Sequence, residues 1–184
     1  MRELRWASED GGGIEHLTFD VRAGRMIAES VLIGERLGST FGLCYRIECD
    51  AQWRTRRAFV RVMGGASLVL QGDGAGNWHD GNGTALGHLE GCIDIDIAAT
   101  PFTNTLPIRR LRLASGARRM LDVAYIAPPG LQVTRERQVY ICIEPDREYR
   151  YESHSGDFRA DLKVDRDGLV LDYPTLFKRL LPAG

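Results

Sequence analysis

The feature that most limits the fold of this chain is a strict alternation of apolar and polar residues. Residues 158–164 read Phe-Arg-Ala-Asp-Leu-Lys-Val, so every second side chain is apolar. In a β-strand successive side chains point to opposite faces, and a period of two therefore indicates a strand with one buried face. Asp165, Asp167 and Gly168 follow as turn residues, and residues 169–171 are apolar again. The pattern predicts a β-hairpin over 158–171.

The same pattern recurs upstream between clusters of Gly, Pro, Asn and Asp. It predicts further strands at residues 41–49, 57–62, 67–71, 92–98, 111–113, 121–126, 131–134, 138–143 and 149–151. Short strands at such spacing are typical of an antiparallel sandwich, barrel or curved meander. No long amphipathic helical pattern alternates with them, which argues against a doubly wound α/β fold. With 184 residues and no low-complexity linker, we expect one domain over 1–184.

One helix is predicted, at the C-terminus. Pro174 suits a first helical position, and residues 173, 176, 177, 180 and 181 then place Tyr, Leu, Phe, Leu and Leu on one face. Such a helix would bury this stripe against the sheet.

Composition excludes several classes of protein and partner. The formal net charge is −1, so no basic field is present to attract nucleic acid. No run of about 18 apolar residues and no signal-peptide pattern occur, which predicts a cytoplasmic protein that does not span a membrane. Cysteines 44, 49, 92 and 142 form no CxxC pair, so we expect buried thiols and neither disulfides nor a zinc site.

The most distinctive stretch is GCIDIDIAATPFTNTLPIRRL, residues 91–111. Its first part is a strand in which Asp94 and Asp96 share one face and the isoleucines share the other, which should meet the densest core. Pro101 and Pro107 interrupt strand pairing, so a loop is expected between them. Arg109 and Arg110 are expected to begin the next strand.

This stretch resembles the core signature of the bacterial putative glycolipid-binding family. Further matching pieces occur in the same order over nearly the whole chain. They are CDAQW at 49–53, GDGxGxW at 72–78, VAYI at 123–126 and DYPTLF at 172–177. The resemblance implies a curved, meandering sheet rolled into a half-barrel, similar in shape to bacterial lipoprotein carriers. It implies a protein that binds a glycolipid or another amphipathic molecule and brings no known catalytic residue.

The predicted binding site is the concave face of the half-barrel. Polar contacts to a ligand head are expected from Asp94, Asp96, Asn104 and Arg110, with Trp53 and Trp78 as aromatic walls. Carboxylates and guanidinium groups suit polar heads, and indole faces suit sugar rings. The competing interpretation is that these charged groups simply pair with one another as structural salt bridges.

Neither a metal nor another cofactor is predicted. Asp94 and Asp96 form a DxD pair, but they lie within an alternating strand and lack the α/β context of nucleotide-dependent enzymes. Residues 72–76 lack the Gly-Lys-Ser/Thr of a phosphate loop, and no GxSxG elbow is present. Two alternatives to a binding protein stay open. One is an enzyme that acts on a small sugar- or lipid-containing substrate through Asp94 or Asp96, and the other is a protein-interaction module that uses sheet edges. The sequence does not specify an oligomeric state.

Overall fold

A computed structural model describes residues 1–154 and 157–180. Its strands join into one 14-stranded sheet with the order β7-β6-β5-β4-β3-β2-β1-β14-β13-β12-β11-β10-β9-β8. The first seven strands are β1 (Arg2–Ser8), β2 (Ile14–Arg22), β3 (Arg25–Arg36), β4 (Ser39–Cys49), β5 (Thr55–Val62), β6 (Ser67–Gly72) and β7 (Trp78–Asp80). The second seven are β8 (Asp94–Ile97), β9 (Arg118–Ala127), β10 (Gln132–Glu144), β11 (Glu148–Ser153), β12 (Arg159–Val164), β13 (Val170–Tyr173) and β14 (Phe177–Leu180). The predicted class, a mainly β fold built on one curved sheet, is confirmed.

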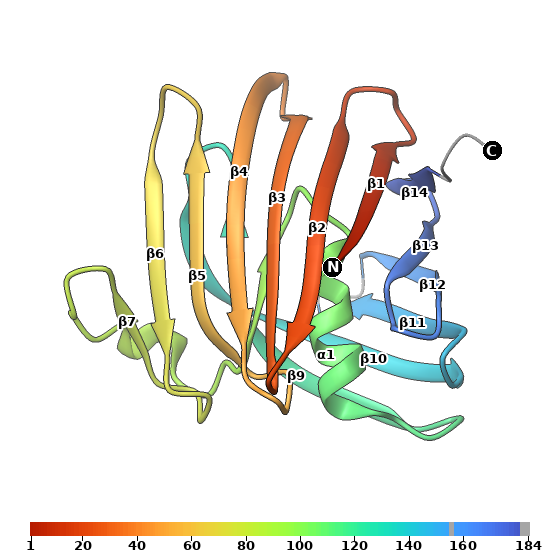
Figure 1. Ribbon diagram of the computed structural model, residues 1–184. Helices are drawn as coiled ribbons and strands as arrows, with labels where there is room; N and C mark the ends of the chain where they lie inside the picture. The colour runs from red at the N-terminus through yellow and green to blue at the C-terminus, as the bar shows by residue number, and fades with distance from the viewer. Residues whose placement is uncertain (155–156, 181–184) are drawn as a thin grey trace.

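Two meanders, β1–β7 and β9–β14, are joined where the first strand pairs with the last. Arg5 lies opposite Leu180 and Ser8 opposite Phe177 in this antiparallel pair. Figure 1 shows β2 to β6 standing side by side, whereas β9 to β11 cross the lower part of the view at a large angle. The sheet stays unclosed, with β7 at one end of the strand order and β8 at the other. One pair departs from the antiparallel prediction, because β8 runs parallel to β9.

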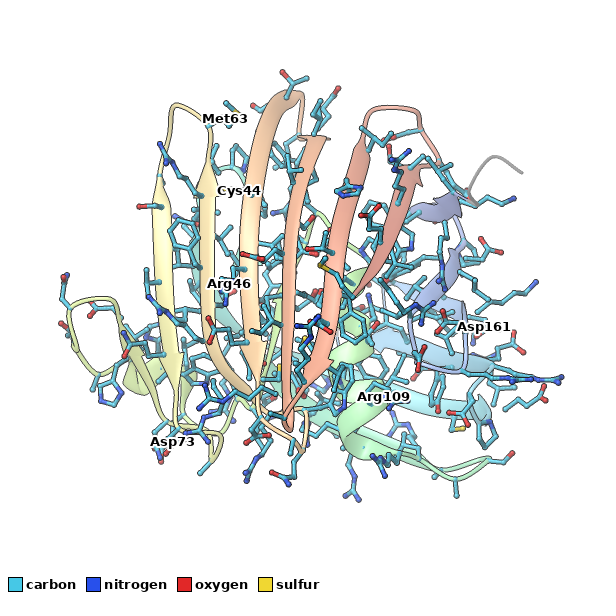
Figure 2. All side chains as sticks on the ribbon, viewed as in Figure 1. Cys44, Arg46, Met63, Asp73, Arg109 and Asp161 are labelled. Carbon is cyan, nitrogen blue, oxygen red and sulfur yellow. The ribbon has the colours of Figure 1, made fainter. Side chains whose placement is uncertain are left out.

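The inner face of the sheet carries the core. Along β4 the inward side chains alternate with outward ones, and Cys44 and Arg46 mark the outer face in Figure 2. Inward Leu43 and Ile47 are at most 1% exposed. Burying an aliphatic side chain of this size contributes about 1.5–3 kcal/mol, and so the alternation itself specifies the register. Ile95 and Ile97 lie in the same cluster, as predicted for the isoleucine face of the DxD strand.

The segment after β8 is helical, which corrects the prediction of a loop followed by a strand. A 3-10 turn, η2 (Phe102–Asn104), leads directly into α1 (Thr105–Leu111). Arg109 and Arg110 therefore lie on a helix. Pro107 is compatible with this because it stands in the first turn of α1, where no intrahelical partner for its nitrogen is needed. The predicted strand at residues 111–113 is absent as well. Leu111 is the last residue of α1, and Arg112 ends the helix in a left-handed conformation.

This helical segment lies between the two halves of the sheet. The Phe102 ring, which is fully buried, lies 6.1 Å from that of Phe19 on β2 and 6.5 Å from that of Tyr45 on β4. On its other side, Asn104 and Arg110 bond to side chains of β10 and β8. The interior of the curve is therefore filled in part by the chain's own residues 100–110.

The predicted C-terminal helix is wrong. Residues 177–180 form β14, which occupies the free edge of β1 and pairs with β13 on its other side. Strand pairing satisfies two rows of backbone groups, and this outweighs the helical spacing of the apolar residues. Leu181, the last member of the predicted stripe, lies outside the described residues.

Strands β1, β2 and β3 were absent from the prediction. On β2 and β3 the inward positions include Glu15 and Ser30, which interrupt the apolar alternation that identified the other strands. The expectation of buried thiols is confirmed for Cys49, Cys92 and Cys142, whereas Cys44 is only half-buried. No helix within residues 1–154 and 157–180 is long and apolar enough to cross a membrane.

Candidate functional site

Asp94 and Arg110, both predicted site residues, form a buried ion pair. Asp94 is fully buried, and the Arg110 side chain is 16% exposed. Arg110 Nε donates to both carboxylate oxygens at 3.0 and 3.1 Å, and Nη2 donates to Oδ2 at 2.6 Å. Burial raises the pKa of Asp94, and the hydrogen bonds and charge of Arg110 oppose that shift. The pair fixes α1 to β8 in the bidentate geometry that guanidinium and carboxylate prefer.

Asp96 and Asn104 are also bonded within the protein. Asp96 accepts from Gln138 Nε2 at 2.6 Å and from Thr103 Oγ1 at 2.9 Å. Burial raises its pKa, and these two donors oppose the shift. Asn104 Oδ1 accepts from the Tyr140 hydroxyl at 2.8 Å. These bonds join the helical segment to β8 and β10.

The two predicted tryptophans are buried as well. Trp78 Nε1 donates to the Cys92 carbonyl at 2.7 Å. Trp53 is 7% exposed, and the guanidinium carbon of Arg109 lies 5.1 Å from its ring centroid.

The competing interpretation, that the charged groups pair as structural salt bridges, describes Asp94 and Arg110. Asp96 and Asn104 bond instead to neutral side chains. That the six residues touch a ligand stays a prediction.

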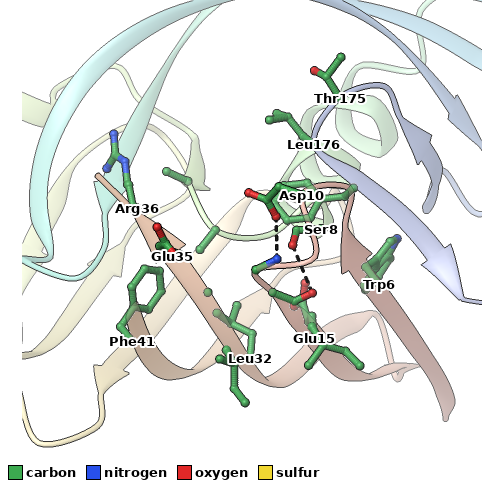
Figure 3. A pocket seen from close by; sticks show the side chains of 18 residues that line it. Trp6, Ser8, Asp10, Glu15, Leu32, Glu35, Arg36, Phe41, Thr175 and Leu176 are labelled. Carbon is green, nitrogen blue, oxygen red and sulfur yellow. Dashed lines mark hydrogen bonds between the residues drawn. The ribbon is translucent and has the colours of Figure 1, made fainter. Parts of the chain in front are cut away.

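A cavity of about 180 Å³ lies elsewhere on the inner face, between the ends of two hairpins. Its floor is one row across the sheet, in which Glu15 on β2 lies opposite Trp6 on β1 and Leu32 on β3. Figure 3 shows Trp6 on one side and Phe41, Glu35 and Arg36 on the other, with Leu176 and Thr175 from the β13–β14 turn above. Ala98 and Ala99, which follow β8 directly, supply part of the wall. None of the six predicted site residues lines it.

Glu15 places a buried carboxyl group in the lining of this cavity. It is 4% exposed. Its Oε1 accepts from Tyr45 and Ser30 hydroxyls at 2.6 and 2.7 Å, and Oε2 accepts from the Thr100 hydroxyl at 2.7 Å. Burial raises the pKa of Glu15, while the three hydroxyl donors lower it. Thr100 precedes η2, so this cluster also ties the helical segment to the front half of the sheet.

Glycine makes the cavity possible at one position. Gly34 on β3 lies opposite Phe41 on β4. A Cβ at Gly34 would lie 3.1 Å from Phe41 Cζ, closer than ordinary contact allows. The missing side chain therefore leaves room for the phenyl ring that forms one wall.

A second, open hollow of about 720 Å³ lies on β9–β11. Tyr125, Gln138 and Tyr151 are among its lining residues. Arg36 connects the two sites, because it lines the cavity while its Nη2 donates to the Tyr125 hydroxyl at 3.2 Å. Its guanidinium carbon lies 5.9 Å from the Tyr125 ring centroid, within cation–π distance.

The cavity was not predicted from the sequence, because no strand was identified within residues 1–40. One signal was available there. In Ile14-Glu-His-Leu-Thr-Phe, the residues Glu15, Leu17 and Phe19 share a face, so an acidic residue stands at an inward position of a strand. A carboxylate placed on the buried face of a strand indicates a hydrogen-bonded cluster or a site.

Comparison with known proteins agrees with the fold and extends it to a family. The profile of the family described as "Putative glycolipid-binding" matches residues 3–179. The crystal structure of a DUF1089 family protein from Pseudomonas aeruginosa is 43% identical, superimposes with a TM-score of 0.81, and matches over 90% of this chain and 92% of its own. No curated protein matches. The chain therefore belongs to the putative glycolipid-binding family.

Proposed function

We propose that this protein binds a glycolipid or a similar amphipathic molecule without chemically changing it, and that the cavity above Glu15 is the binding site. The observation that carries the proposal is the make-up of this cavity. Trp6, Leu32 and Phe41 give it apolar walls, while Glu15 and Ser8 place polar groups among them. Largely apolar pockets with a few placed polar groups are the usual form of small-molecule sites.

The size of the cavity indicates which part of a ligand it holds. Complete small-molecule pockets usually measure about 300–1,000 Å³, and a cavity of about 150 Å³ can hold a benzene molecule. At about 180 Å³ the cavity suits one ring of a larger ligand. The open hollow on β9–β11, whose Tyr125 is bonded to Arg36 of the cavity lining, offers space for the remainder.

The location of Asp94 and Asp96 favours a binding role over a catalytic one. Burial raises the pKa of Asp94 and of Asp96, which is a property of many catalytic carboxylates. However, Asp94 is fully buried beneath Arg110, and neither aspartate lines the cavity. We propose an indirect role for Asp94, Asp96, Asn104 and Arg110 in which they hold the segment that carries Ala98 and Ala99. Trp53 and Trp78 would support the same segment from the opposite half of the sheet.

The proposal is tested with octyl β-D-glucoside below its micelle concentration. Isothermal titration calorimetry should detect binding to the wild type and a loss of at least tenfold in affinity for Ala99→Phe, whose ring would fill the cavity. Ala51→Phe is the matched control, because Ala51 is an exposed residue of the β4–β5 turn. Equal affinities for all three proteins would reject the cavity as the site, and absence of binding to the wild type would reject the proposed function for this class of ligand.

A further inference from the structure

Glu15 lacks a cationic partner within the described part of the chain. Its three observed bonds all come from neutral hydroxyls, and no Arg, Lys or His nitrogen of that part lies within ion-pair distance of it. An ionised carboxylate offers about four acceptor positions. Two of the bonds reach Oε1 and one reaches Oε2, and so Oε2 retains an acceptor position at a residue that lines the cavity.

A buried carboxylate in this state favours a ligand that brings a donor. Desolvation of an unpaired charge costs several kcal/mol, and a charged or neutral hydrogen-bond donor offsets part of that cost. An apolar chain end could not do so. A hydroxyl or ammonium group beside Oε2 is therefore favoured at the floor.

The charges around the cavity also favour a neutral or cationic ligand group over an anionic one. Besides Glu15, the carboxylates of Asp10 and Glu35 line it. The Ser8 hydroxyl and the Gly12 amide lower the pKa of Asp10, which keeps it ionised at neutral pH. Arg36 is the one basic residue in the lining, and its guanidinium is engaged with Tyr125. Three carboxylates against one engaged guanidinium repel an anionic group.

We propose that the cavity admits the head of the ligand first, as a single neutral or amino-substituted sugar ring whose hydroxyl or ammonium group donates to Glu15, and that it excludes anionic heads. The aromatic walls suit the apolar faces of such a ring. This inference rests on the proposed function and adds to it the orientation of the ligand and the charge of its head.

Three octyl glycosides that differ only in head charge test the proposal. They are octyl β-D-glucosaminide (cationic), octyl β-D-glucoside (neutral) and octyl β-D-glucuronide (anionic). The expected order of affinity is glucosaminide, then glucoside, then glucuronide, with about tenfold between the first and the last. Glu15→Gln should weaken glucosaminide binding by about tenfold, because it removes the charge while nearly preserving the shape.

Two further variants keep the result interpretable. Glu35→Gln changes an exposed residue of the cavity and should reduce the difference between glucosaminide and glucuronide without affecting folding. Glu144→Gln is the control, since its side chain is 55% exposed and does not line the cavity. Thermal unfolding of each variant verifies that it is folded.

The outcomes separate this inference from the proposed function. Equal binding of all three glycosides, or unchanged or tighter binding to Glu15→Gln, would overturn the head-first orientation while leaving amphipathic binding intact. Failure of every glycoside to bind the wild type would instead reject the proposed function itself.

Discussion

Arg110 on α1 holds both carboxylate oxygens of the fully buried Asp94 on β8, and this contact fixes the helical segment inside the curved sheet. Arg110→Ala would leave the aspartate buried without a counter-charge. We expect it to lower the free energy of unfolding by about 3 kcal/mol, measured by urea denaturation.

Arg147→Ala is the control for this change. Arg147 pairs with Glu144 at 3.2 Å, but its side chain is 76% exposed, so the loss should stay within about 0.5 kcal/mol. Similar losses for both arginine variants would contradict the structural importance of the Asp94–Arg110 pair.

Gly76→Ala should destabilise the protein more than Gly83→Ala. Both glycines have positive φ, +101° and +86°, so both substitutions strain the backbone. A Cβ at Gly76 would also lie 2.8 Å from Gly91 Cα, whereas one at Gly83 meets nothing within 4 Å. The difference in unfolding free energy should therefore reach at least about 1 kcal/mol. Equal losses would show that the approach of residues 76 and 91 is unimportant.

The stability of the wild type relative to Glu15→Gln should fall as the pH rises. Burial raises the pKa of Glu15 above its ordinary value of 4.5. The folded state then retains a proton that the unfolded state has released, and this contribution to stability is complete below about pH 4.5 and is lost as the pH rises through the folded pKa. Urea denaturation of both proteins between pH 4 and 8 measures the difference, in which the contributions of Asp94 and Asp96 cancel. A difference that increases with pH would contradict the buried placement of Glu15.

The thiols should react with Ellman's reagent in two classes. Cys44 is half-buried on the outer face, whereas Cys49, Cys92 and Cys142 are buried. Burial also raises the pKa of Cys92 to about 11, so little thiolate forms there at pH 8. We expect a fast reaction of one thiol, absent from Cys44→Ser, and reaction of the other three only on unfolding. A fast phase that persists in Cys44→Ser would contradict the placement.

Strands whose inward positions alternate cleanly as apolar residues, such as β4 and β12, were predicted. Strands were missed where hydrogen bonding between paired strands, and not an apolar alternation, determines the structure. Glu15 and Ser30 occupy inward positions of β2 and β3, and their mutual hydrogen bond is visible only when the strands are paired. Leu180 lies in a strand because the edge of β1 is free to accept it, which local periodicity does not reveal.

For the candidate site, too, local sequence identified some residues but could not reveal how distant segments come together. Asp94 and Arg110 were predicted as site residues because they lie in the motif that carries the family resemblance. In the structure they form a buried ion pair that holds α1 against β8. The cavity combines residues from the first hairpins, from the loop after β8 and from the β13–β14 turn. Such a combination depends on the β1–β14 pairing, and no local motif contains it.

The central claim is that the cavity above Glu15 holds an amphipathic ligand, and the most direct measurement is native mass spectrometry of gently purified protein, followed by extraction of whatever is bound. Wild-type protein, as purified or after incubation with octyl β-D-glucoside, should carry one bound amphiphile, which Ala99→Phe should lack and Ala51→Phe should retain. Equal occupancy in Ala99→Phe, or no bound molecule in the wild type under either condition, would contradict the account.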